Sequence, residues 1–94
     1  MQTRRNERVA TNIATVGRMP ASFAEVTVLD LSTEGCQIKT SSTLARVGAT
    51  VLLPLSDRDD VAGQIVWKEA DRCGVRFFND LPEGAIDWIA ISVD

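Results

Sequence analysis

The sequence has 94 residues, of which 45% are hydrophobic and 24% charged, and its formal net charge is −3. This length suffices for one domain, and the composition is close to the average of folded globular domains, which excludes a wholly disordered chain. The longest apolar stretches, Val51–Leu55 and Ile86–Val93, are far shorter than the roughly 20 residues that span a bilayer. No apolar segment follows the first basic residues, so no signal peptide or membrane insertion is predicted and a cytoplasmic protein is expected.

Charge is distributed unevenly along the chain. Residues 1–8 contain three arginines and one glutamate, a net charge of +2, whereas the other 86 residues contain seven basic and twelve acidic residues, a net charge of −5. We expect residues 1–9 to form a flexible basic arm and residues 10–94 to form one domain. An acidic body with a basic arm suits a small anionic ligand and disfavours long nucleic acids, because most of the surface would repel them.

The sequence contains no histidine and two cysteines, Cys36 and Cys73. Histidine is the commonest general base and part of the Ser–His and Cys–His nucleophile pairs, and no carboxylate pair has a recognisable catalytic setting, so we expect no enzymatic activity. Two widely separated cysteines also form no zinc cluster, and no metal or cofactor is expected. We interpret both cysteines as small buried strand residues, with a disulfide or a reactive thiol as the alternatives.

From Ala10 to Phe78, short strand-like segments alternate with polar or glycine-containing turns, which is typical of a β-sandwich or barrel. The first strand is predicted to end at Gly17 and Pro20, and Ser41–Val47 to connect the third and fourth strands. The six predicted strands are Thr11–Val16, Ala24–Leu31, Cys36–Thr40, Thr50–Leu55, Val61–Lys68 and Gly74–Phe78.

The fifth of these strands has the clearest alternation of apolar and polar residues. Gly63 in this strand predicts a bulge or a sharp bend. Trp67 is then a core residue, or alternatively an aromatic residue that stacks near a ligand. The residues predicted to share one face are Val61, Gly63, Ile65 and Trp67.

After Asn79 the hydrophobic period becomes that of a helix. Pro82 occupies the position of a first helical residue, with Asp80 as a candidate N-cap. A short amphipathic helix that lies on the barrel is therefore predicted. Its apolar face comprises Ala85, Ile86, Trp88 and Ile89, with Val93 as a further candidate.

The first functional motif is Arg4-x-x-x-Arg8, with Arg5 inside it. The guanidinium group is a rigid fork of donors that matches two phosphate oxygens, or the O6 and N7 acceptors of guanine, and its plane stacks on bases. Taken alone, three arginines near the start of a chain are more typical of a solvated tail.

The second motif is the D-x-S-x-x-G pattern of Asp30–Gly35, at the end of a predicted strand. Taken alone it is typical of an ordinary turn. In extended geometry, Asp30 and Ser32 project from the same face. A carboxylate accepts the N1 and N2 hydrogens of guanine, a hydroxyl donates to a phosphate oxygen, and Gly35 allows a tight turn or a close approach to a ligand.

In order and spacing, these motifs resemble the PilZ domain family. The resemblance extends over essentially the whole chain and includes Gly63–Trp67 and Gly74–Phe77. It implies an all-β fold, a six-stranded antiparallel barrel with a short C-terminal helix, that binds the bacterial second messenger cyclic di-GMP. The ligand-binding residues that it implies are Arg4, Arg8, Asp30, Ser32 and Gly35. We add Arg5, which lies between the two arginines but outside the matched spacing, and Trp67, if it stacks near the ligand, as candidate ligand-binding residues.

Three functions stay open at this point. The leading one is a monomeric cyclic di-GMP receptor that signals through an unidentified protein partner. The second is an interaction module with the same fold that does not bind the nucleotide, against which the intact motifs argue. The third, a small nucleic-acid-binding barrel, conflicts with the acidic body of the protein.

Overall fold

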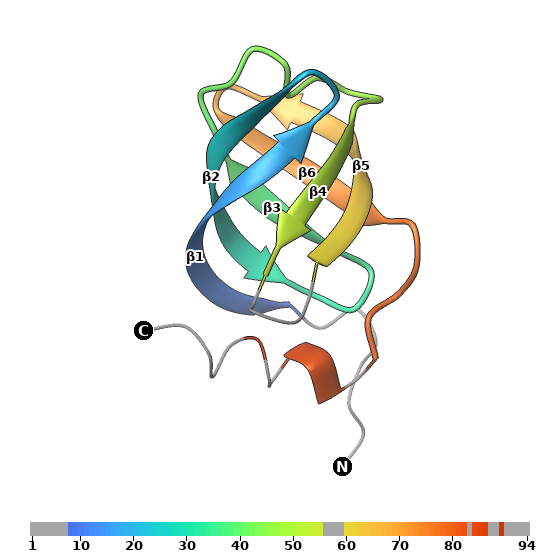
Figure 1. The fold of residues 1–94 in the computed structure, drawn as a ribbon. Coiled ribbons are helices and arrows are strands. Elements are labelled where there is room, and N and C mark those ends of the chain that lie inside the picture. Colours follow the sequence, from blue (N-terminus) through green and yellow to red (C-terminus); the bar gives the residue numbers. More distant parts are fainter. Residues whose placement is uncertain (1–7, 56–59, 83, 87–88, 90–94) are drawn as a thin grey trace.

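The computed structural model describes residues 8–55, 60–82, 84–86 and 89 of the chain. Six antiparallel strands close into a barrel in the order β1-β2-β3-β6-β5-β4 (Figure 1), which confirms the predicted fold class. No helix in these ranges is both long and apolar enough to cross a membrane. The strands are β1 (Val9–Met19), β2 (Ser22–Leu31), β3 (Gly35–Lys39), β4 (Thr50–Pro54), β5 (Asp60–Glu69) and β6 (Arg72–Phe77).

The first strand is longer than predicted. Gly17 does not end β1, which continues to Met19 before the turn at Pro20. Gly17 is buried and faces the barrel interior, where a Cβ atom would lie 3.3 Å from a methyl group of Leu53. This glycine therefore serves the packing of the barrel wall against the core. The other predicted strands are present, with ends that differ by one or two residues.

The barrel interior is filled by alternate side chains of every strand. Val28, Ile38 and Leu53 have no exposed surface at all. Cys36 and Cys73 are buried among them as free thiols, which confirms their interpretation as packed strand residues.

The alternation predicted for the fifth strand is wrong at Trp67. The register of β5 and β6 shifts between Ile65, which lies opposite Val75, and Trp67, which lies opposite Gly74. Val66 is thus the extra residue of a β-bulge, and a bulge reverses which face the following side chains occupy. Ile65 is 1% exposed and Trp67 is 40% exposed, so Trp67 lies on the outer face. The bulge follows Gly63 by three residues rather than lying at it.

The predicted helix is present as a short helical segment at residues 84–86 and 89. Figure 1 shows the first of these residues beneath one end of the barrel. Ile86 and Ile89 are buried against the core, as predicted, and Ala85 packs beside them. Trp88 and Val93, which were also assigned to its apolar face, lie outside the described residues.

Candidate ligand-binding groove

The carboxylate of Asp30, near the end of β2, is held by two residues. Its Oδ1 atom accepts a hydrogen bond of 3.0 Å from the backbone N–H of Gln37, and its Oδ2 atom accepts one of 2.9 Å from the Gln37 side-chain amide. Oδ1 also accepts a bond of 2.7 Å from Nη1 of Arg8. Arg8 and Asp30, both predicted as site residues, are therefore in direct contact. The side chain of Arg8 is 50% exposed and that of Asp30 only 18%.

The hydroxyl group of Ser32 organises the turn between β2 and β3. It accepts hydrogen bonds from the backbone N–H groups of Glu34 and Gly35, at 3.3 and 3.2 Å, and donates to the carbonyl oxygen of Gly35. The backbone of Ser32 donates to the same carbonyl oxygen at 2.9 Å. Ser32 is 2% exposed, and its hydroxyl group fixes the shape of this turn in the free protein.

Gly35 is required by a close approach of two strands. It lies opposite Arg76 in the pairing of β3 with β6, and a Cβ atom built on it would collide with the carbonyl oxygen of Val75. The structure therefore shows a close approach of Gly35 to the backbone of β6. The close approach to a ligand that the sequence suggested for Gly35 stays a prediction.

The indole ring of Trp67 lies over Gly74. Any side chain at position 74 would overlap this ring, because a Cβ atom built there meets three of its atoms. The bulge at Val66 turns Trp67 outwards, and the missing side chain of Gly74 gives the ring a flat place on the neighbouring strand. An exposed aromatic face held in this way is suited to stacking on a planar ligand group.

These features border one groove of about 520 Å³ on the outer face of the barrel. Of the described residues predicted for the site, Asp30 alone does not line the groove, but it holds Arg8, which does. Arg4 and Arg5 lie outside the described residues. The groove is lined by Arg8, Ser32, Glu34, Gly35, Cys36, Gln37, Val66, Trp67, Gly74, Val75 and Arg76.

Sequence reasoning missed Gln37 and Arg76 as residues of this groove. Gln37 follows the second motif by two residues, and nothing in the sequence signals its bond to Asp30. Arg76 belongs to a segment that the resemblance included, but its place in the groove follows only from the pairing of β6 with β3 and β5.

Cys36 belongs to the groove lining but is almost fully buried, and its thiol is poorly suited to act as a nucleophile. Burial, with a smaller effect from the nearby charge of Asp30, raises the pKa of its thiol from 9.0 to about 12, and Arg8 offsets only part of this rise. The thiol is therefore protonated at neutral pH, and the thiolate is the reactive form. Within the described ranges, no cluster of three potential metal ligands was found either.

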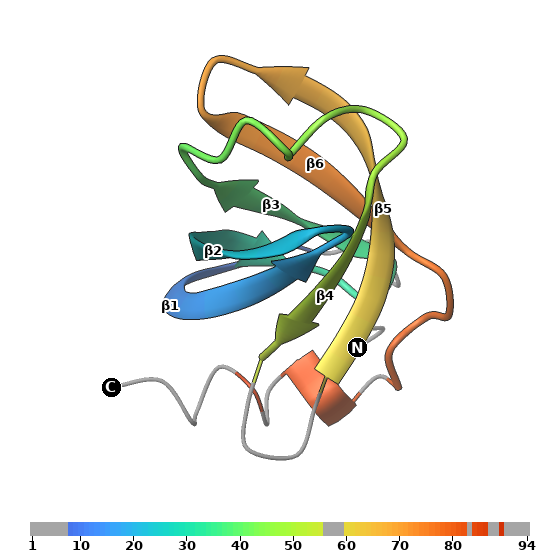
Figure 2. The same ribbon diagram turned by 45° about the horizontal axis from the view of Figure 1, so that its top comes forward.

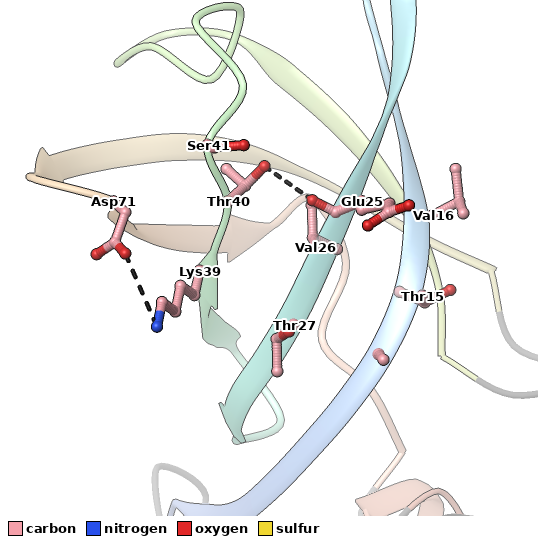
Figure 3. Close-up of a pocket in the computed structure, with 10 residues that line it drawn as sticks. Thr15, Val16, Glu25, Val26, Thr27, Lys39, Thr40, Ser41 and Asp71 are labelled. Carbon is pink, nitrogen blue, oxygen red and sulfur yellow. Dashed lines mark hydrogen bonds and ion pairs between the residues drawn. The ribbon is translucent and has the colours of Figure 1, made fainter.

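A second groove, of about 550 Å³, crosses the outer faces of β1, β2 and β3 (Figure 3). Its one cationic lining residue, Lys39, lies 3.9 Å from the carboxylate of Asp71. Glu25 adds a further negative charge, and its carbonyl oxygen accepts a bond from Thr40. This groove has neither an arginine nor an aromatic residue, so the first groove is the better candidate for an anionic nucleotide.

The model of the PilZ domain family matches residues 2–91, which include both motifs and all six strands. Searches of curated proteins and of solved structures gave no significant match. The family match covers nearly all of the chain and agrees with the closed six-stranded barrel. The chain therefore belongs to the PilZ domain family.

Proposed function

We propose that this protein is a cyclic di-GMP receptor that signals through a protein partner and catalyses no reaction. The PilZ domain implies a family of cyclic di-GMP-binding modules. The observation that carries the proposal for this chain is the position of Arg8 and Trp67 on one groove, with Arg8 oriented by Asp30. A guanidinium group and an exposed aromatic face match the two chemical features of the ligand, its phosphodiester groups and its guanine bases.

In this proposal Asp30 is a positioning residue in the free protein. Its oxygen atoms accept three hydrogen bonds from Gln37 and Arg8. Only one N–H group of Arg8 is used in this contact, and a guanidinium group has five. Among the described residues Arg8 donates only to Asp30. In this proposal its other N–H groups bind phosphate oxygens or the O6 and N7 atoms of a guanine, while Trp67 stacks on a base. Arg4 and Arg5 supply further donors from the N-terminal residues.

Calorimetric titration with cyclic di-GMP tests this proposal. We expect saturable binding by the wild-type protein, and at least tenfold weaker binding after Arg8→Ala or Arg4→Ala, since a hydrogen bond to a charged group contributes roughly 1.5–3 kcal/mol. Arg18→Ala is the matched control. Arg18 lies near the end of β1, whereas Arg8 directly precedes the start of this strand. The guanidinium group of Arg18 lies over the ring of Phe23 and does not line the groove.

A gel-shift assay with DNA and RNA separates the alternatives. If the protein is a receptor for a small nucleotide, it binds cyclic di-GMP and does not retard the migration of either DNA or RNA. Retardation with no binding of cyclic di-GMP would favour a nucleic-acid-binding barrel. Failure of all three ligands to bind would favour the interaction module that does not use the nucleotide.

A further inference from the structure

Arg76 is a second cation in the groove and belongs to neither motif. It is exposed on the outer face of β6, opposite Gly35 of β3 and Gln64 of β5. Two ion pairs occur between residues that the structure describes, Arg8–Asp30 and Lys39–Asp71, and neither includes Arg76. The guanidinium group of Arg76 is thus the one in the groove that no described carboxylate neutralises.

The two arginines of the groove stand on opposite sides of β3. Arg8 donates a hydrogen bond to Asp30 of β2, whereas Arg76 is a residue of β6. Two strand spacings, about 10 Å, separate β2 from β6. Between them Gly35 carries no side chain, and any Cβ atom there would collide with β6. A ligand that lies across β3 therefore meets a guanidinium group at each side and no obstacle at this point of the floor.

Trp67 places a base within reach of Arg76. The ring lies over Gly74, and Arg76 is two residues further along β6 on the same face. Two residues of a strand span about 7 Å, which the long side chain of an arginine bridges readily. A purine stacked on Trp67 would therefore present one of its edges, or its phosphate, to Arg76.

We infer that Arg76 is a further ligand-binding residue, which binds the phosphate oxygens or the guanine O6 and N7 edge of the half of the ligand that lies over β6. The inference rests on the proposed function. A cyclic dinucleotide has two phosphates and two guanines, so the half that is bound by Arg8 leaves an equivalent set of acceptors on the other side of β3. Arg76 is the residue on that side with the donors to bind them.

Arg76→Ala tests this inference, with Arg72→Ala as its matched control. Arg72 is on the same strand and the same outer face, is exposed in the same way, and does not line the groove. In calorimetric titrations with cyclic di-GMP we expect at least tenfold weaker binding for Arg76→Ala and less than a twofold change for Arg72→Ala. Arg76→Lys, which keeps the charge but loses the fork, should bind with intermediate affinity. If the alanine variant does not fold, Arg76→Gln replaces it.

The outcomes separate the inference from the function on which it rests. If the wild-type protein binds cyclic di-GMP, Arg8→Ala weakens binding, and a folded Arg76 variant binds like the wild type, the inference is wrong and the proposed function stands. If the wild-type protein does not bind cyclic di-GMP at all, both are wrong. Equal losses for Arg72→Ala and Arg76→Ala would also overturn the inference, because they would indicate a general effect of positive charge.

Discussion

The carboxylate of Asp30 joins residues that lie far apart in the sequence, since Arg8 precedes it by 22 positions and Gln37 follows it by 7. Each bond has a different consequence. The bonds from Gln37 tie β3 to β2 and are partly buried, whereas the bond from Arg8 is exposed. Removal of the carboxylate should therefore affect both the stability and the binding properties of the protein.

We predict that Asp30→Ala lowers both the free energy of unfolding and the affinity for cyclic di-GMP. It leaves a partly buried backbone N–H group without its acceptor, which costs about 1–3 kcal/mol. Urea unfolding and calorimetric titration measure the two effects. Asp71→Ala is the control, because its ion pair with Lys39 is long and exposed and such pairs contribute about 0–1 kcal/mol. Unchanged stability of Asp30→Ala would show that the bonds from Gln37 do not matter.

The order and spacing of two motifs predicted Asp30 and Arg8 as site residues. They did not predict Gln37 and Arg76 as further residues of the groove. A motif contains residues that are close together along the chain. Gln37 and Arg76 belong to neither motif, and the pairing of the strands brings them to the groove. The register of β3 with β2 and β6 decides both positions. No local pattern of polar and apolar residues contains that register.

The thiol of Cys36 gives a pH dependence of stability that is opposite in direction to that of a paired carboxylate. Its pKa rises from 9.0 to about 12 on folding, chiefly because of burial. Above pH 9 the unfolded chain releases this proton while the folded protein keeps it. The stabilisation is thus complete below pH 9 and is lost as the pH rises towards 12. The slope is about 1.4 kcal/mol per pH unit.

We predict that wild-type stability falls by about 2 kcal/mol more than that of Cys36→Ala between pH 8 and pH 10.5, owing to this linkage. Urea unfolding at the two pH values, followed by circular dichroism, measures the difference. The comparison is within each protein, so the packing defect of the variant cancels. Burial also raises the pKa of Cys73, so Cys36→Ala should retain part of the decline. Parallel declines in both proteins would contradict the prediction.

At the scale of the elements, the bulge in β5 determines what the groove contains. Regular alternation after Ile65 would have placed Trp67 in the core, as the sequence pattern indicated. The extra residue Val66 reverses this, and Gly74 on β6 receives the ring. The sequence does carry both Trp67 and Gly74, but their contact depends on the shifted register, which period-two analysis of one strand cannot detect.

The close contact of β3 with β6 predicts the outcome of substitution at Gly35. Gly35→Ala should lower the free energy of unfolding by about 3 kcal/mol, because the new methyl group collides with the Val75 carbonyl oxygen and backbone cannot move aside cheaply. Gly17→Ala is the control. Its methyl group would meet a Leu53 side chain at 3.3 Å, which shifts at a cost below about 1 kcal/mol. Chemical unfolding compares the two, and equal losses would show that the β3–β6 approach is not tight.

At the scale of the whole molecule, the barrel has one weak seam. β1 and β2 share nine register pairs, whereas β1 and β4 share one, Arg18 with Leu52, within the described parts of the strands. A side-chain bond of 2.9 Å from Thr15 Oγ1 to the carbonyl oxygen of Pro54 supplements this seam. Figure 2 shows β4 crossing between β1 and β5, where it closes the barrel. Apart from Arg8, which directly precedes β1, the groove residues lie on β3, β6 and β5 and on the turn before β3. These three strands stay paired with one another when the seam between β1 and β4 opens.

We predict that the barrel opens first between β1 and β4, and that Thr15→Val promotes this opening. The substitution keeps the shape of the side chain but removes its bond to Pro54, which contributes about 0.5–1.5 kcal/mol. Native-state hydrogen exchange should show faster exchange for Val51–Leu53 than for β3 and β6, and Thr15→Val should widen this difference. Thr11→Val is the control, because Thr11 makes a similar bond of 2.7 Å to the Val28 carbonyl oxygen, at the irregularity between Ala10 and Ile13 in the pairing of β1 with β2 and not at the seam with β4. If Thr15→Val instead accelerated exchange equally in all six strands, opening would be global and the weak-seam hypothesis would have to be abandoned.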